Sequence, residues 1–168
     1  MTRSTAREIA IQMVFSLSFG NVSADELLNS QMNRDRFQEL EAEMPIYAQY
    51  PDEKQEKYIK DLVHGVFAHG PELDDYISRY AVGWSFARIP RMASAIMRTA
   101  MYEVLYMPEI PNAAAINEAV EIAKSYEGPE IVSFINGILG SFVRAEFADT
   151  PPKPEKAAKD SAADKTED

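Results

Sequence analysis

Apolar side chains recur at helical spacing through the C-terminal half of this chain, and this pattern constrains the fold more than any other feature. Three such sets occupy residues 89–107, 114–126 and 130–147. The last set is the broadest and comprises Ile131, Phe134, Ile135, Ile138, Leu139, Phe142 and Val143. Apolar residues at positions i, i+3 and i+4 line one face of a helix, so the pattern predicts packed amphipathic helices. Because the last set covers more than one face, we expect that helix to be central.

Turn and capping residues divide the chain into about seven helices with no strands. We expect the helices over residues 4–18, 23–42, 53–69, 72–80, 89–107, 114–126 and 130–147. Ser23 and Asp52 are suitable N-cap residues, and glycine or proline separates several of the helices. Gly137 and Gly140 lie inside the last helix, where each costs about 1 kcal/mol relative to alanine. We therefore expect another helix to approach closely at these glycines.

Length and composition favour one small all-α domain over residues 1–147, because a chain of 168 residues can bury a sizeable core. The absence of cysteine excludes disulfides and thiolate metal sites. No apolar run approaches the roughly 20 residues needed to cross a bilayer, so we expect no membrane contact and a cytoplasmic location. Residues 148–168 lack an apolar period and are expected to form a disordered tail whose removal leaves stability unchanged.

The charge of the chain is distributed unevenly. Its net charge is −10, and residues 21–80 carry most of it, with thirteen acidic against six basic side chains. Nucleic-acid affinity depends largely on neutralising phosphates with lysine and arginine. Such a chain is a poor RNA binder by itself. RNA binding would require a local basic face or a cationic partner.

The sequence gives no positive sign of an active site. His64 and His69 are the only histidines, and Asp61 stands three residues before His64, but a second such pair is missing. There is no glycine-rich phosphate loop, nucleophile elbow or zinc signature. We expect no catalytic residues, no metal and no cofactor. Three glutamates, Glu103, Glu118 and Glu121, are interpreted as solvated side chains or as partners of Arg98.

Three arginines and a tyrosine follow one side of the predicted helix over residues 89–107 and its approach: Arg88, Arg91, Arg98 and Tyr102. They could form a basic ridge for RNA or for an acidic partner. They could also form salt bridges to the glutamates named above, with the arginine stems covering the core. We prefer salt bridges, because arginine often packs its stem while pairing its head.

An ordered series of short motifs resembles the NusB family of bacterial transcription antitermination factors. The series is Trp84, Arg88, Ile96-Met97-Arg98, Ala100-Met101-Tyr102-Glu103, Ile110-Pro111, Ile116-Asn117-Glu118-Ala119 and Phe134-Ile135-Asn136-Gly137. Ala6-Arg7-Glu8 also matches near the start of the chain. The resemblance is good over residues 81–143 and partial over residues 3–17. It implies a NusB-like fold of two packed helical sub-bundles, the first holding the three helices up to residue 69 and the second the remaining four.

The resemblance also implies where RNA would bind. Of the family's N-terminal arginine-rich run, which meets the RNA backbone, only Arg3 and Arg7 remain. These two stand four residues apart, and we expect both to project away from the buried face of their helix, so that replacing them by glutamate leaves the helix folded. Further candidate RNA contacts are Phe15, Glu130, Ser133, Phe134 and Asn136. Phe15 stands where the family often has tyrosine, and Ser133 where it frequently has lysine or arginine. Phe134 is a candidate base-stacking platform that equally fits the core.

The function that the resemblance implies is non-enzymatic. The protein would pair with a NusE-like ribosomal small-subunit protein, capture single-stranded boxA-like RNA and act indirectly on the RNA polymerase elongation complex to suppress termination. The candidate residues for the protein partner are Tyr80, Arg88, Arg91 and Tyr102. Two alternatives stay open: a NusB-like interaction module with weak or no RNA binding, and an accessory domain related to those of RNA cytosine methyltransferases. Whether the chain forms a homodimer is also open.

Overall fold

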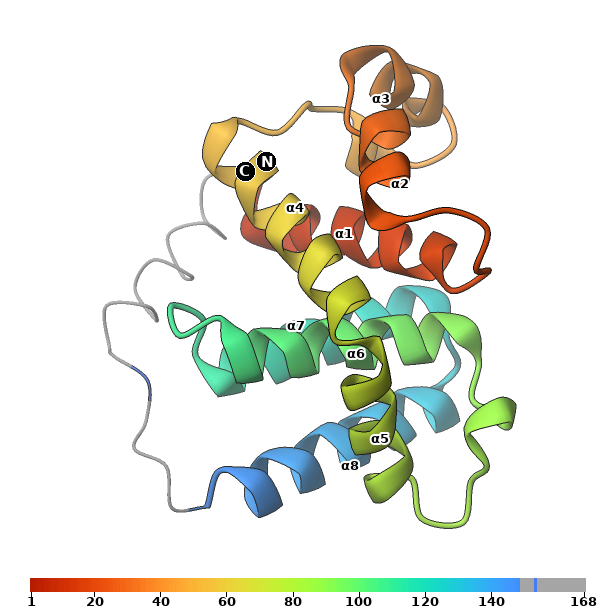
Figure 1. The fold of residues 1–168 in the computed structure, drawn as a ribbon, viewed down its shortest axis with the longest axis vertical. Coiled ribbons are helices and arrows are strands. Elements are labelled where there is room, and N and C mark those ends of the chain that lie inside the picture. Colours follow the sequence, from red (N-terminus) through yellow and green to blue (C-terminus); the bar gives the residue numbers. More distant parts are fainter. Residues whose placement is uncertain (149–152, 154–168) are drawn as a thin grey trace.

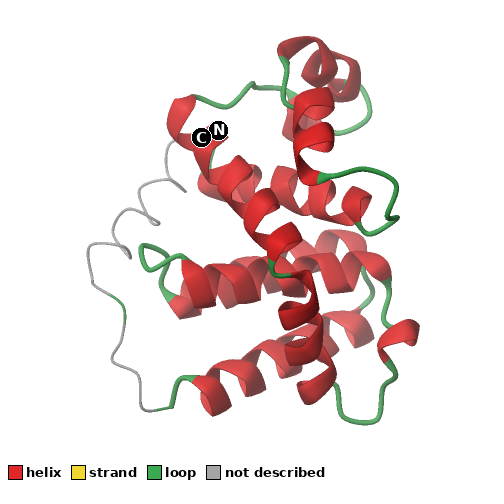
Figure 2. Cartoon of the chain, in the orientation of Figure 1, coloured by secondary structure: helices red, strands yellow, loops and turns green. Residues whose placement is uncertain are grey.

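The computed structural model describes residues 1–148 and Lys153, and every regular element among them is helical (Figure 2). This confirms the predicted all-α class. The elements are α1 (Arg3–Leu17), α2 (Ala24–Gln31), α3 (Arg34–Glu41), the 3₁₀ turn η1 (Pro45–Tyr47), α4 (Glu53–Ala68), α5 (Gly70–Tyr80), the 3₁₀ turn η2 (Phe86–Arg88), α6 (Arg91–Tyr106), α7 (Asn112–Tyr126) and α8 (Pro129–Glu146).

The helices form the two predicted groups. In Figure 1, α2 and α3 lie beyond α1 and α4 at one end of the molecule, and α5 and α8 lie at the other end. Helix α6 lies between the groups and packs against α1, α4, α5, α7 and α8. The expectation that the last helix is the central one is wrong. Ten of the sixteen residues of α6 are buried, against four of the eighteen residues of α8.

One predicted helix is two. The expected helix over residues 23–42 breaks at Met32, whose backbone leaves the helical region with φ −89° and ψ 66°. Asn33 then starts α3 by accepting a hydrogen bond from the backbone N–H of Arg36 at 2.8 Å. Asparagine is among the best N-cap residues, and its side chain gives the chain a local reason to restart. The predicted caps at Ser23 and Asp52 are confirmed, and Asp52 forms a complete capping box with Gln55.

Close helix packing occurs at a different glycine from those expected. A Cβ atom on Gly65 of α4 would lie 2.0 Å from the ring of Tyr102 on α6, so only glycine fits there. In α8, a Cβ atom on Gly137 would meet nothing within 4 Å, and one on Gly140 would meet only the side chain of Arg144. The expectation of a close helix approach at Gly137 and Gly140 is therefore wrong.

Lys153 contacts the helical core. Its ammonium group donates hydrogen bonds to the backbone carbonyls of Glu103 at 3.1 Å, Met107 at 3.1 Å and Ile110 at 2.5 Å, at the C-terminal end of α6. The sequence pattern does not predict this contact. The rest of the predicted disordered tail lies outside the described residues, apart from Ala148. No helix in the described part of the chain is long and apolar enough to cross a membrane.

Candidate nucleic-acid and protein interfaces

Arg7, a predicted RNA contact, lies in the protein interior with 1% of its surface exposed. Its Nε and Nη2 atoms donate to the two carboxylate oxygens of Glu103 at 2.7 and 2.8 Å. Glu103 is fully buried on α6 and also accepts a hydrogen bond from the hydroxyl of Tyr58 at 3.1 Å. The expectation that Arg7 projects away from the buried face of α1 is wrong. The guanidinium group has no open surface to offer a phosphate.

Charge holds this buried cluster together. Glu118 of α7 adds a second carboxylate, 3.7 Å from Arg7. Burial by itself would lower the pKa of Arg7, but the charges of Glu103, ionised Tyr58 and Glu118 and the hydrogen bonds that Arg7 donates to Glu103 raise it above its ordinary value. Burial, followed by the charge of Glu103, raises the pKa of Tyr58 well above its usual range. The interpretation of Glu103 and Glu118 as solvated groups or partners of Arg98 is wrong, because both face Arg7. The cluster joins α1, α4, α6 and α7.

Arg3 lies one helical turn before Arg7 and is also largely covered, with 9% of its surface exposed. Its guanidinium group stands 4.8 Å from the centre of the Tyr58 ring, a distance suited to a cation–π contact. Both predicted N-terminal contacts therefore pack at the start of α1, so the expectation that Arg3 projects away from the protein is wrong as well.

Phe15 lies towards the other end of α1 and is half-buried. Its ring meets the ring of Phe19 edge-on at 5.2 Å. Phe19 is 51% exposed and lies under the guanidinium group of Arg91, at 4.6 Å. Arg91 also donates to the backbone carbonyl of Ser18 at 2.8 Å and so ties the start of α6 to the end of α1. Phe15 thus lies near the C-terminal end of α1, whereas Arg3 and Arg7 lie in its N-terminal half.

The predicted contacts on α8 lie beside a groove. A hollow of about 450 Å³ between α7 and α8 is lined by Val120, Lys124, Glu127, Pro129, Val132, Ser133 and Asn136. Ser133 and Asn136 are exposed, as is Glu130 in the first turn of α8. Phe134 is half-buried, and its ring packs against Trp84 at 4.8 Å between centroids. The structure therefore brings Ser133 and Asn136 together and directs Phe134 towards another surface.

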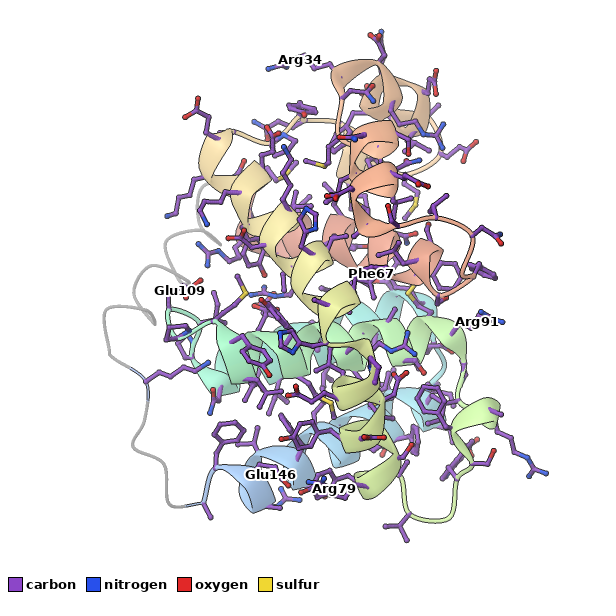
Figure 3. The ribbon with its side chains drawn as sticks, viewed as in Figure 1. Arg34, Phe67, Arg79, Arg91, Glu109 and Glu146 are labelled. Carbon is purple, nitrogen blue, oxygen red and sulfur yellow. The ribbon has the colours of Figure 1, made fainter. Side chains whose placement is uncertain are left out.

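The four predicted partner contacts are dispersed. Figure 3 shows Arg91 well away from Arg79 and Glu146. Tyr80, at the end of α5, donates a hydrogen bond to Glu146, which also pairs with Arg79 at 3.0 Å. Tyr102 lies over Gly65 of α4 and contacts Tyr106 at 5.1 Å between ring centres. Arg88 is exposed on η2.

The preferred pairing of the arginines with Glu103, Glu118 or Glu121 is also wrong. Arg98 pairs with Asp74 of α5 at 2.6 Å. Arg91 bonds instead to a backbone carbonyl, as described above.

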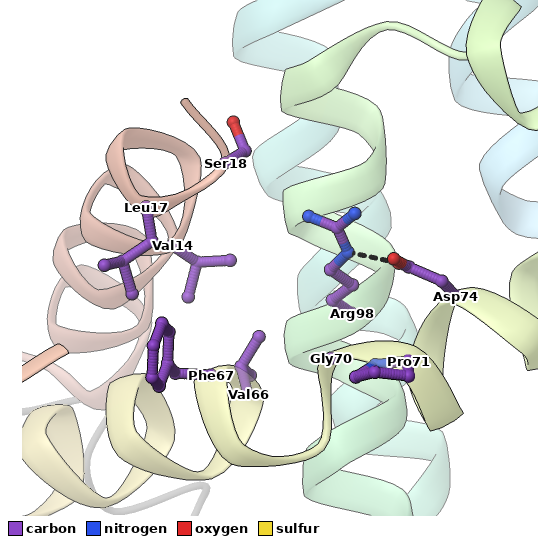
Figure 4. Close-up of a pocket in the computed structure, with 9 residues that line it drawn as sticks. All are labelled: Val14, Leu17, Ser18, Val66, Phe67, Gly70, Pro71, Asp74 and Arg98. Atoms are coloured by element: carbon purple, nitrogen blue, oxygen red, sulfur yellow. Dashed lines mark hydrogen bonds and ion pairs between the residues drawn. The ribbon is translucent and has the colours of Figure 1, made fainter. Parts of the chain in front are cut away.

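A second hollow lies between the two helix groups (Figure 4). It has a volume of about 220 Å³ and is lined by Val14, Leu17, Ser18, Val66, Phe67, Gly70, Pro71, Asp74 and Arg98. Phe67 is 51% exposed and forms part of the apolar side. The Arg98–Asp74 ion pair forms the opposite side. The hollow therefore combines an apolar surface with paired charges, as protein interfaces commonly do.

The histidines lie in ordinary surface contacts. His64 faces Asp25 at 3.3 Å, and His69 faces Glu72 at 3.3 Å while its ring stacks on Tyr106. Within residues 1–148 and Lys153, no three histidine, aspartate or glutamate side chains gather as a metal-ion site.

Comparisons with known proteins all identify relatives from one family. Residues 4–144 match the model of the NusB family. The chain is 38% identical to the transcription antitermination protein NusB of Acetivibrio thermocellus over 147 residues, which cover 88% of this chain and 92% of that protein. It is 39% identical over 140 residues to the protein of the same name from Carboxydothermus hydrogenoformans, covering 83% and 91% of the two chains.

Solved structures share the fold. The structure of T. maritima NusB superposes with a TM-score of 0.73 at 24% identity and covers 95% of this chain and 98% of that chain. A structure of the antitermination factors NusB and NusE in complex with dsRNA superposes with a TM-score of 0.67 at 20% identity, covering 85% and 96%. At these identities the likeness establishes the arrangement of the helices.

Proposed function

This chain belongs to the NusB family, and from that premise we propose that it is a transcription antitermination factor. In this proposal it pairs with a NusE-like ribosomal small-subunit protein, and the pair holds single-stranded boxA-like RNA near the elongating RNA polymerase. The observation that carries the proposal is the match over most of the chain to bacterial proteins of this name. The role is non-enzymatic and belongs to the cytoplasm, where bacterial transcription takes place.

The RNA would meet the protein on two helices, along the N-terminal half of α8 and at the C-terminal end of α1. Ser133, Asn136 and Lys124 border a groove whose sides are largely apolar, which suits the face of an unpaired base. Glu130 stands at the N-terminal end of the same helix. Phe134 adds aromatic surface on another side of α8, and Phe15 adds it on α1. Arg7 and Arg3 support this surface indirectly, because they fix the position of α1.

The protein partner would meet the hollow between the two helix groups. Arg98 lines the hollow, and Arg91 bonds to the backbone of Ser18 at its edge. Phe67 offers an exposed apolar contact. The neighbouring helix α5 begins with Glu72, Asp74 and Asp75. A basic ribosomal protein suits such a surface, since complementary charge favours encounter and register. We also propose that residues 1–147 form one domain, because α1 packs on both α4 and α6.

The test is an RNA titration with and without the cognate NusE-like protein. A single-stranded RNA copied from the leader of the organism's ribosomal RNA operon should bind the protein weakly and the two-protein complex more tightly. A scrambled RNA of equal length serves as control. Equal affinity for both RNAs in the presence of the partner would refute the proposed recognition.

The burial of Arg3 and Arg7 favours a second candidate, a NusB-like interaction module that does not bind RNA. The same titration separates the two. This candidate predicts formation of the two-protein complex without any gain in RNA binding over the ribosomal protein by itself.

A further inference from the structure

The loop between α5 and α6 exposes large apolar side chains. Val82 is 87% exposed and Trp84 is 38% exposed. Gly83 between them has φ +83°, a backbone conformation that glycine adopts without strain. Single exposed apolar residues are common, but two in one short loop, one of them the only tryptophan of the chain, call for an explanation.

Trp84 packs on Phe134 of α8. The ring centroids are 4.8 Å apart and the ring planes are inclined by 42°. Phe134 is itself half-buried and packs against the hydrophobic core. The indole ring is therefore held in place from one side, while more than a third of its surface stays open to solvent.

The segment that carries Trp84 differs in charge from the rest of the chain. Residues 81–102 contain three arginines and no acidic residue, in a chain whose net charge is −10. Arg98 is paired with Asp74, and Arg91 bonds to a backbone carbonyl, whereas Arg88 is exposed four residues after Trp84. An aromatic residue four positions before an exposed arginine, in a stretch of sequence without carboxylates, suits a polyanion with flat bases.

The surface beside the aromatic pair is open. Gly137 follows Phe134 by about one turn of α8, and a Cβ atom there would meet nothing within 4 Å. Ser133 and Asn136 are exposed on the same helix. A nucleotide stacked on the indole ring would therefore meet uncrowded backbone at this turn of α8.

We propose that Trp84 is a base-stacking residue, with Phe134 as its support and Arg88 as the adjacent cation for phosphate. This inference rests on the proposed RNA-binding function and extends the RNA surface from α8 to the α5–α6 loop. The occupant is an unpaired nucleobase, because every base has a face that can stack and because the segment is cationic.

The chain provides its own probe, since Trp84 is its only tryptophan. The ribosomal leader RNA described above should quench Trp84 emission in the two-protein complex, and the quench should saturate at the concentration at which binding saturates. Emission from any tryptophan of the ribosomal protein is removed by subtracting the signal of the Trp84→Phe complex. Trp84→Ala should weaken RNA binding by about 5- to 150-fold, the range for losing one aromatic–base stack. Trp84→Phe should retain most of the affinity.

Val82→Ser is the matched control, because it alters the same exposed loop without removing an aromatic ring, and it should bind RNA like the unaltered protein. Circular dichroism and melting of each variant show that the fold is kept. If the unaltered complex does not bind the RNA, the proposed function itself fails. If it binds and Trp84→Ala binds equally well, the assignment of Trp84 is overturned. A change of Trp84 emission caused by the ribosomal protein, with none caused by RNA, would overturn it in favour of a protein contact.

Discussion

Replacing Arg7 by methionine tests whether this residue belongs to the core. Methionine keeps most of the length and apolar stem of the side chain and removes the charge. The structure predicts a large loss of stability. Replacing a solvent-exposed arginine that contacts RNA would leave the stability nearly unchanged.

The magnitude follows from what the substitution leaves behind. Glu103 has no exposed surface and would lose both charge-assisted hydrogen bonds from Arg7, at 2.7 and 2.8 Å. The hydroxyl of Tyr58 would be its one remaining bond partner among the contacts described above. Removing one partner of a buried ion pair typically costs about 3–5 kcal/mol. For a domain of this size each kcal/mol lowers Tm by about 2–4 °C, so Tm should fall by about 6–20 °C.

Urea unfolding at neutral pH, followed by far-UV circular dichroism, measures the effect. The double variant Arg7→Met with Glu103→Leu should regain part of the stability, since it removes both charges from the interior. Arg36→Met is the control, and its cost should be smaller because Arg36 and its partner Glu39 are both accessible to solvent. A free energy of unfolding for Arg7→Met within about 0.5 kcal/mol of the unaltered protein, the range of ordinary surface substitutions, would refute the assignment of Arg7 to the core.

Two further predictions concern the end of α6 and the response to alkali. Lys153→Met should lower stability by about 1–2 kcal/mol in urea unfolding, because the ammonium group bonds three carbonyls at a helix C-terminus, where a cation is favoured; no change would show that this contact does not anchor the chain. Burial and Glu103 raise the pKa of Tyr58, so the folded state keeps a proton that the unfolded state loses above about pH 10. Stability should therefore hold up to about pH 10 and fall beyond it. Above about pH 10 the urea midpoint of Tyr58→Phe should fall less steeply with pH than that of the unaltered protein. Equal slopes for the two proteins would show that Tyr58 is not the buried group responsible.

Local patterns were sufficient to predict most of the helices. Proline and glycine punctuation and the 3.6-residue period place α4 and α6–α8 within a few residues of their predicted ranges. The break at Met32 was missed because the apolar spacing continues across it, while the cap at Asn33 was a readable signal. The close approach at Gly65 depends on where the ring of Tyr102 falls in three dimensions, and no local pattern encodes that.

The buried ion cluster shows the limit of reading a site from the sequence. Arg7 and Glu103 are 96 residues apart, and neither has a charged partner within its own helix to reveal the pairing. The sequence does contain one sign of the pairing. Glu103 stands three residues after Ala100 and therefore lies on the apolar side of the predicted helix. A charged residue on a buried stripe is almost always paired. Arg7, next to the buried Ala6, was the corresponding cation on another helix.

The location of Arg7 changes where cations are available to a nucleic acid. Inside the protein, Arg7 and Glu103 compensate each other, so the start of α1 contributes little attraction for phosphate. Around the proposed RNA surface, the exposed positive charge lies with Arg88 on η2, Arg91 at the start of α6 and Lys124 on α7. Lys124 is moreover paired with Glu121 at 2.7 Å. These cations can neutralise few phosphates at the proposed RNA surface, and the salt dependence of RNA affinity grows with the number of phosphates neutralised. Base stacking and a basic protein partner therefore have to provide most of the RNA affinity. For this reason the proposed function depends on the partner, and the stack on Trp84 is expected to contribute strongly.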